Sequence, residues 1–182
     1  TKGATSYPPQ TESSNISTTR YILEGLGLEV VNVLDEPSAA NLVLKLQDGA
    51  IVDVGGGTTG IAVIKNGKIV YTNDEPTGGI HLTLVLAGGL KVSYEKAEGM
   101  KADRKMTPQI IQVVRPVIDK ISSIALSYLK DFKDVETVCL VGGTCELEGL
   151  AEIVKKNLNL NILKLNGAQM ITPYGIALSC LS

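Results

Sequence analysis

The sequence has almost no net charge and no long apolar stretch. Its 17 Lys and Arg residues nearly balance 19 Asp and Glu residues and leave a net charge of −2, so the basic footprint that nucleic-acid binding requires is absent. No run of about 18 uncharged apolar residues is available to span a bilayer. We therefore expect neither a nucleic acid nor a membrane among the partners of the protein.

Cysteine is scarce as well. The three cysteines, Cys139, Cys145 and Cys180, are an odd number without a signal peptide, which predicts reduced thiols in a cytoplasmic protein. The length of 182 residues, of which 44% are hydrophobic, suffices for one domain and part of another and excludes a collagen, a disordered tail or a small disulfide scaffold. The chain begins with Thr1 rather than Met, so we expect a longer natural protein.

The first quarter of the chain predicts a helix, a strand and a second helix. Ser17 is a suitable N-cap, Gly27 a suitable stop, and Pro37 a suitable opening residue for the second helix. The expected elements are a loop at residues 1–20 with the end of a strand at 3–5, a helix from Ser17 to Leu26, a strand at 29–34 and a helix from Pro37 to about Leu46.

From residue 50 onward, three β-rich runs precede alternating helices and strands. Asn66-Gly67 separates two of these runs and is a strong hairpin signal, because a type I′ turn needs positive φ at both central residues. The order βββ-α-β-α-β-α is that of a ribonuclease-H-like domain, an α/β fold with a mixed five-stranded sheet and right-handed crossovers. The expected strands are residues 50–54, 61–64, 68–71, 137–141 and 161–165.

The expected helices of this part each begin at a glycine, serine, threonine or proline. One carries an apolar stripe that must face a core, at Ile110, Val114, Val117, Ile121, Ile124 and Tyr128. The helices run from Gly79 to about Leu90, from the N-cap Ser93, from the N-cap Thr107, from Gly143 to about Asn157 and from Pro173.

The motif DVGGGTTG at residues 53–60 lies in the turn between two expected strands. Three consecutive glycines let the backbone approach a ligand and direct successive N–H groups into one concavity, which suits a phosphate. Thr58 and Thr59 add hydroxyl donors, and Asp53 can hold a cation through its water shell. The motif predicts a phosphate and Mg²⁺ site, with a glycine-rich hairpin that needs positive φ as the structural alternative.

A second glycine turn, VGGTC at residues 141–145, follows a strand and precedes a helix. Such a turn can cradle a nucleotide, whose negative charge is favoured at a helix N-terminus. A lone pair of glycines more often marks tight packing, which is the alternative here. Neither motif has the spacing of a P-loop or of a dinucleotide fingerprint.

Together, the motifs resemble those of the actin, Hsp-type chaperone and sugar-kinase superfamily. Residues 53–59 are similar to its phosphate-2 motif and residues 141–144 to its adenosine motif, while DEPSAA at 35–40 and PYGIA at 173–177 resemble its two connecting helices. Within the superfamily, the chain most resembles the EutJ family, the chaperone-like proteins of ethanolamine-utilisation operons, at residues 3–9, 52–61 and 74–82.

The resemblance implies two ribonuclease-H-like lobes that close on ATP and Mg²⁺. Residues 1–47 would be the C-terminal remnant of the first lobe, a helix–strand–helix portion, and residues 48–182 the complete second lobe. The phosphate hairpin of the first lobe is missing, so we expect a truncation, with a partner that covers the surface as the alternative. By the same resemblance, Asp53 positions Mg²⁺, the phosphates are held by Gly55, Gly56, Gly57, Thr58 and Thr59, and the adenosine packs on Gly142, Gly143 and Thr144.

Other residues have a functional and a structural interpretation. Arg115, Asp119 and Lys120 lie in the region where related chaperones contact the ribose and base, although Lys120 also suits a solvated helix face. We expect His81 to be a hydrogen-bonded structural residue and Cys145 a packed thiol, with a catalytic role and a lowered pKa as alternatives. Small residues predict a close crossing of the connecting helices at a hinge, namely Ala39, Ala40, Gly175 and Ala177.

Three functions follow from the resemblance. The first is an ATP-binding chaperone-like protein that acts on a client, an ethanolamine-pathway enzyme or a microcompartment component. The alternatives are an actin-like assembly or scaffold ATPase of the cell-division and pilus type, and a small-molecule kinase. We expect a weak ATPase at most in the full-length protein and no turnover in this part alone. We also expect a cytoplasmic location in association with a bacterial microcompartment.

Overall fold

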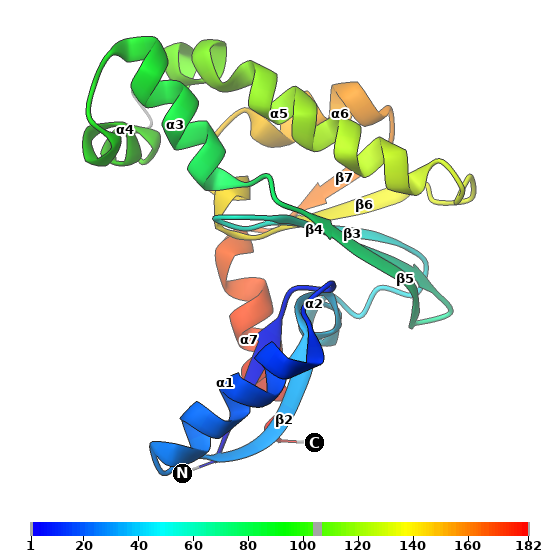
Figure 1. Ribbon diagram of the computed structural model, residues 1–182. Coiled ribbons are helices and arrows are strands. Elements are labelled where there is room, and N and C mark those ends of the chain that lie inside the picture. The colour runs from blue at the N-terminus through cyan, green and yellow to red at the C-terminus, as the bar shows by residue number, and fades with distance from the viewer. Residues whose placement is uncertain (1, 104–106, 182) are drawn as a thin grey trace.

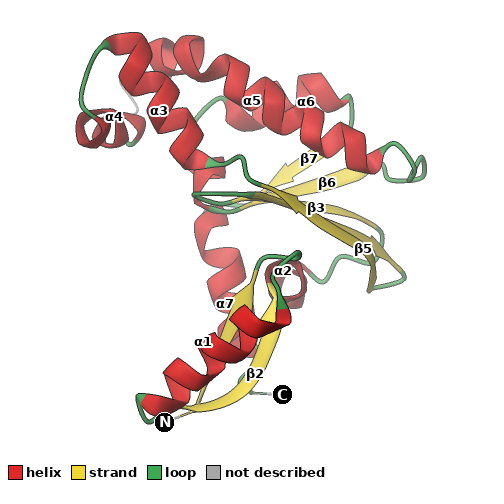
Figure 2. Ribbon diagram, in the orientation of Figure 1, coloured by secondary structure: helices red, strands yellow, loops and turns green. Residues whose placement is uncertain are grey.

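The computed structural model describes residues 2–103 and 107–181, which form two sheets and the helices around them (Figure 1). Helices make up most of the periphery, as the secondary-structure colouring shows (Figure 2). In chain order the elements are β1 (Lys2–Tyr7), α1 (Ser13–Gly25), β2 (Glu29–Asp35), α2 (Glu36–Leu44), β3 (Gly49–Val54), β4 (Thr59–Lys65), β5 (Lys68–Glu75), α3 (Gly79–Leu90), α4 (Tyr94–Lys101), α5 (Thr107–Leu129), β6 (Thr137–Val141), η2 (Gly143–Glu146), α6 (Leu150–Leu158), β7 (Asn161–Lys164), η3 (Ala168–Met170) and α7 (Ile171–Leu178).

The larger sheet has five strands in the order β5-β4-β3-β6-β7. β3, β4 and β5 form an antiparallel meander, whereas β6 pairs in parallel with β3, and β7 in parallel with β6. Asn66 and Gly67 have φ values of 51° and 72°, as the predicted hairpin between β4 and β5 requires. The prediction of an α/β fold with a mixed five-stranded sheet is confirmed.

Helices cover both faces of the larger sheet. α3, α5 and α6 lie on one face, and α2 and α7 lie on the other (Figure 1). Because side chains alternate along a strand, Val52 and Val54 of β3 join the core with α3 and α5, whereas Ile51 joins the smaller core with α2 and α7. The predicted stripe of α5 is confirmed by the burial of Ile110, Val114, Val117, Ile121 and Ile124.

The smaller sheet consists of β1 and β2, which pair in parallel. The loop predicted over residues 1–20 is wrong for most of this segment. β1 occupies residues 2–7 and so extends the strand end expected at 3–5, and the first turns of α1 begin at Ser13. α1 begins at Ser13 and not after Ser17. Two threonine hydroxyls in α1 donate to carbonyl oxygens four residues earlier, so this Ser- and Thr-rich segment satisfies its side chains within the helix.

Two predicted helix starts in the second half are wrong as well. After the second glycine turn the chain forms the short 3₁₀ helix η2, and α6 begins only at Leu150, because Leu147 is extended with ψ of 118°. α7 begins at Ile171, so Pro173 is its third residue rather than its first. α5 begins at Thr107 itself, and its N-cap lies outside the described residues.

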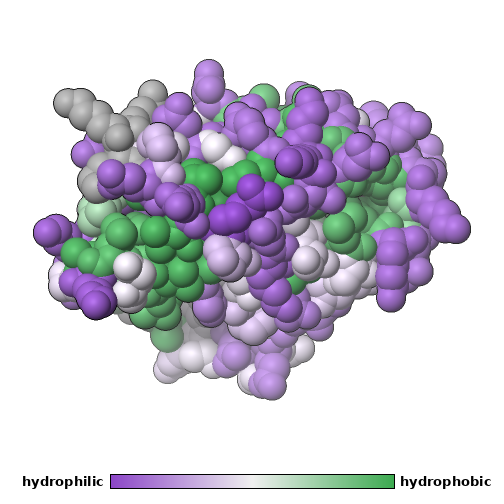
Figure 3. All heavy atoms as spheres, turned by 90° about the horizontal axis from the view of Figure 1, so that it is seen from above, coloured by the Kyte–Doolittle hydropathy of each residue, from purple (hydrophilic) through white to green (hydrophobic). Residues whose placement is uncertain are grey.

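The outer face of α3 is apolar and uncovered. Ile80, Leu84 and Val85 are 44%, 55% and 39% exposed, and the view from above shows an apolar area on the side of α3 (Figure 3). In the described part of the chain, no helix combines the length and the apolarity that crossing a membrane requires.

α2 and α7 cross in close contact between the two sheets (Figure 1). A Cβ on Gly175 would lie 1.7 Å from the carbonyl oxygen of Ala39, so the two backbones touch directly. Ala39 and Ala40 are fully buried, which confirms the predicted close crossing at these positions. Ala177 is exposed, so its predicted place in the crossing is wrong.

We predict that Gly175→Ala lowers the melting temperature strongly, because the added Cβ pushes α7 away from α2. Overpacking of this kind costs about 1–3 kcal/mol or more, and each kcal/mol shifts the Tm of a chain of this size by roughly 2–4 °C. The matched control is Gly88→Ala in α3, whose Cβ would meet no atom within 4 Å and should raise Tm slightly, since alanine favours helices. Equal melting temperatures in a calorimeter would contradict the close crossing.

Candidate functional site: three glycine turns beside a cavity

Three glycine-containing turns meet at one edge of the larger sheet. They follow β3, β5 and β6, whose carboxyl ends share this edge because the three strands run in one direction. The N–H of Gly79 donates to the carbonyl oxygen of Gly55 at 2.9 Å, and the N–H of Ile80 does the same to Gly56 at 2.8 Å. The hydroxyl of Thr144 also donates to the Gly55 oxygen, at 2.8 Å. A single carbonyl group therefore joins all three turns.

Two glycines at this edge leave no room for a side chain. Gly142 has φ of 93°, and a Cβ there would lie 2.4 Å from Oδ1 of Asp53. A Cβ on Gly78 would lie 2.7 Å from the carbonyl oxygen of Gly55. Tight packing is the alternative interpretation of the motif at residues 141–145, and it explains why position 142 is glycine. It explains Gly78, in the turn after β5, in the same way.

Gly56 and Gly57 are glycines for a different reason. Neither they nor Gly55 has a positive φ, which removes the positive-φ hairpin as an explanation. A Cβ on Gly56 or Gly57 would meet no atom within 4 Å, so packing does not explain them either. Both are exposed, and no residue that the structure describes accepts a hydrogen bond from their N–H groups. The loop thus presents two open donors where a ligand can approach the backbone closely.

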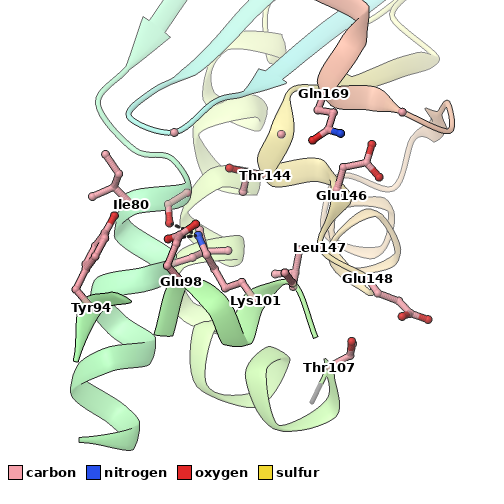
Figure 4. Close-up of a pocket in the computed structure, with 16 residues that line it drawn as sticks. Ile80, Tyr94, Glu98, Lys101, Thr107, Thr144, Glu146, Leu147, Glu148 and Gln169 are labelled. Atoms are coloured by element: carbon pink, nitrogen blue, oxygen red, sulfur yellow. Dashed lines mark hydrogen bonds and ion pairs between the residues drawn. The ribbon is translucent and has the colours of Figure 1, made fainter. Parts of the chain in front are cut away.

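A cavity of about 790 Å³ opens beside this loop, within the size range of small-molecule sites. One wall comes from α3 and α4, where Ile80 and Tyr94 lie near each other (Figure 4). The opposite wall comes from η2 and η3, where Glu146 and Gln169 approach each other (Figure 4). The cavity therefore combines an apolar patch, polar groups and a glycine loop at its edge.

The predicted site residues are distributed unevenly around the cavity. Gly56, Gly143 and Thr144 line it, and Gly55, Gly57 and Thr58 belong to the same loop as Gly56. Thr59 lies apart from them: it is fully buried in β4, and its hydroxyl donates to the Thr77 carbonyl at 2.6 Å. That hydroxyl stabilises the turn after β5 and does not face the cavity.

Glu98 and Lys101 of α4 form a charged pair in the cavity wall that the sequence reasoning missed (Figure 4). Nζ of Lys101 lies 3.0 Å from Oε2 of Glu98 and donates to the carbonyl oxygen of Gly79 at 3.1 Å. Burial alone would raise the pKa of Glu98, but hydrogen bonds from Thr83 and Lys101 lower it below its usual value. The pair stays ionised and ties α4 to the first turn of α3.

Asp53 is the penultimate residue of β3 and is only 8% exposed. Its Oδ2 accepts a hydrogen bond from the Thr172 hydroxyl at 3.0 Å, and burial raises its pKa. In the first turn of α2, burial and then the charges of Asp53, Asp74 and Asp35 raise the pKa of Glu36 to about 7. Among the described residues, no three His, Cys, Asp or Glu side chains form a metal-binding group.

A family model described as Cell division protein FtsA matches residues 50–176. The chain belongs to the FtsA family. The α/β architecture of this FtsA-family chain is also that of solved relatives. The crystal structure of the ethanolamine utilization protein EutJ from Carboxydothermus hydrogenoformans matches it with a TM-score of 0.89 at 45% identity, over 96% of this chain and 64% of that one.

Two further relatives are similar to the FtsA-family chain over almost its whole length. Ethanolamine utilization protein EutJ of Escherichia coli K12 is 41% identical over 97% of this chain and 62% of its own length. MreB 5 of Spiroplasma citri, solved with AMPPNP, has a TM-score of 0.84 at 16% identity over 96% of this chain and 66% of that one, and so shares the fold. The predicted resemblance to EutJ and the predicted fold are confirmed. The chain spans about 62% of the length of this curated relative.

Arg115 and Asp119, which are expected near the ribose and base together with Lys120, make contacts between helices in this FtsA-family chain. Nε of Arg115 lies 2.8 Å from Oδ1 of Asp119, which also accepts a hydrogen bond from Asn157 at 2.7 Å. These contacts tie α5 to α6, and none of the three residues lines the cavity. Lys120 is exposed, as its alternative predicted. A positively charged side chain in the cavity wall is instead that of Lys101. Lys101 follows Glu98 by three residues on α4, the helix that Ser93 caps.

His81 and Cys145 have structural contacts in the FtsA-family chain. Nδ1 of His81 accepts a hydrogen bond from the N–H of Gly78 at 3.1 Å. Cys145 is fully buried and its Sγ donates to the Val141 carbonyl at 3.0 Å. Burial, followed by the charge of Asp53, raises the pKa of this thiol to about 12, so Cys145 is a packed thiol and its alternative of a lowered pKa is wrong.

We predict that Glu36→Gln stabilises the protein at pH 8 and has little effect near pH 4.5. The pKa of Glu36 is raised from 4.5 to about 7, so between these values the folded chain holds a proton that the unfolded chain has lost. Its contribution to stability is therefore greatest at low pH and falls as the pH rises through 7. Urea unfolding at both pH values measures the difference, with the exposed Glu136→Gln as control. A difference that does not change with pH would contradict this assignment.

Proposed function

We propose that this chain is the nucleotide-binding part of an ATP- and Mg²⁺-binding, chaperone-like protein of ethanolamine utilisation. The observation that carries the proposal is the pair Gly56 and Gly57, whose missing side chains are explained neither by backbone conformation nor by packing. Their open N–H groups stand at the edge of a cavity of about 790 Å³. A phosphate that approaches the backbone closely would explain why both positions are glycine.

The phosphates would bind the loop and not the start of α3. The first N–H groups of that helix, those of Gly79 and Ile80, already donate to loop carbonyls. The open donors are therefore those of Gly56 and Gly57, with the hydroxyl of Thr58 in the same turn. Backbone donors also fit a chain with a net charge of −2, because such a site needs no cluster of lysines.

The nucleoside would occupy the cavity between α4 and η2. Glu98 accepts and Lys101 donates hydrogen bonds at its wall, and ribose hydroxyls can do both. In the chaperone relatives that the sequence resembles, a Glu and a basic residue contact the ribose and base, and these two residues take that role here. Gly143 and Thr144 would pack on the adenosine from the opposite side.

A divalent cation would neutralise the carboxylates of Asp53 in β3 and Glu36 in α2. Asp53 is buried and Glu36 is half-buried, and burial raises the pKa of each. Mg²⁺ bound through water would lower this electrostatic cost and bridge to the phosphates. Asp53 is the residue that positions the ion, and Glu36 is a second acceptor in the neighbourhood.

The action on a client is proposed from the relatives named for ethanolamine utilisation. Residues 1–47 would be the C-terminal portion of a first lobe and residues 48–182 the second lobe, with α2 and α7 as connecting helices. Closure of two lobes on ATP would change the grip on a client protein, an enzyme of the ethanolamine pathway or a component of its microcompartment, in the cytoplasm.

We predict that MgATP raises the melting temperature of the protein and that Asp53→Asn removes the Mg²⁺-dependent part of this shift. A ligand at 100 times its Kd stabilises by about 2.7 kcal/mol, which corresponds to roughly 5–10 °C for a chain of this size. The exposed Asp131→Asn serves as the matched control and should keep the full shift. An unchanged shift in Asp53→Asn would overturn the assignment of Asp53, and no shift in the wild type would overturn the proposed function.

An assembly ATPase is the second candidate, favoured by the family match to cell division protein FtsA and by the apolar outer face of α3. For this function, ATP would drive growth of filaments or clusters. Light scattering with and without MgATP separates the candidates. The chaperone-like proposal expects no nucleotide-dependent growth, whereas growth that Leu84→Glu abolishes would favour assembly.

A further inference from the structure

We propose that His81 is a positioning residue of the nucleotide site, which holds the phosphate-binding loop in place through the acceptor Nδ1 of its imidazole ring. This inference rests on the proposed function, because it concerns the geometry of the same site. His81 does not line the cavity, so it acts through the backbone of α3.

The imidazole of His81 takes the place of a side-chain cap for α3. Gly78, the residue before the helix, has no side chain with which to cap it. Nδ1 of His81 instead accepts the N–H of Gly78 at 3.1 Å, while the N–H of His81 donates to the Gly78 carbonyl at 3.0 Å. Because Nδ1 acts as the acceptor, the ring proton of the neutral imidazole must be on Nε2.

The segment that His81 holds lies directly on the loop. The next two residues, Gly79 and Ile80, donate to the carbonyl oxygens of Gly55 and Gly56. A Cβ on Gly78 would lie 2.7 and 2.8 Å from the same two oxygens, so the backbone of Gly78 packs directly against the loop with no room for a side chain between them. A shift of Gly78 is therefore transmitted to Gly55 and Gly56, on which the open donors depend.

Two variants separate the acceptor from the ring. His81→Gln keeps an acceptor at the position where capping boxes place Glu or Gln. His81→Phe keeps a ring of similar shape but has no acceptor. The Kd for MgATP is measured by calorimetry at pH 7.5 for both variants and the wild type.

We expect His81→Gln to bind as tightly as the wild type and His81→Phe to bind about fivefold more weakly, which is the typical effect of losing a helix cap. Weak binding by His81→Gln, or binding by His81→Phe as tight as that of the wild type, would overturn the proposal.

A second readout needs no nucleotide. His81 is the only histidine of the chain, so ¹⁵N NMR reports its ring without ambiguity. We expect the Nε2–H tautomer at pH 7.5, and faster exchange of the Gly79 and Ile80 amides in His81→Phe than in His81→Gln. The Nδ1–H tautomer or equal exchange would overturn the role of His81. If the wild type binds no nucleotide at any pH, the proposed function fails, and this readout still decides the role of His81.

Discussion

The carbonyl group of Gly55 is the point on which the site depends. It accepts hydrogen bonds from the Gly79 N–H at 2.9 Å and the Thr144 hydroxyl at 2.8 Å, and so it joins the turns after β3, β5 and β6. Each turn positions something else: the open amides of the loop, the start of α3, or the wall formed by η2. Because the acceptor is shared, the three turns are fastened to one another beside the cavity.

A second constraint lies where the two sheets approach each other. The backbones of α2 and α7 touch at Ala39 and Gly175, which brings the carboxylate of Glu36 near that of Asp53. Both carboxyl groups have raised pKa values, chiefly because of burial. Ionising both carboxyl groups at this crossing therefore carries an electrostatic cost, which protonation relieves.

The larger sheet could be predicted from the sequence because its signals are local: alternating apolar runs and the Asn66-Gly67 turn. The sequence predicts only the strand end at residues 3–5 of β1, because the whole strand forms through its parallel partner β2, which lies beyond α1, and no local pattern shows such a pairing. The same holds for Glu98 and Lys101, which would be ordinary surface residues if α4 did not face the cavity. Thr59 lies beside Thr58 in the motif, but its hydroxyl turns inward to Thr77, which residue type alone does not reveal.

The most direct measurement is a crystal structure of the protein grown with Mg²⁺ and AMPPNP. We expect phosphate oxygens within hydrogen-bond distance of the Gly56 and Gly57 N–H groups, and the ribose beside Glu98 and Lys101. The adenine should occupy the cavity of about 790 Å³, and the ion should lie on the side of Asp53. A nucleotide bound elsewhere, or phosphates that leave both loop amides without a partner, would contradict the central claim that these glycines exist for a ligand.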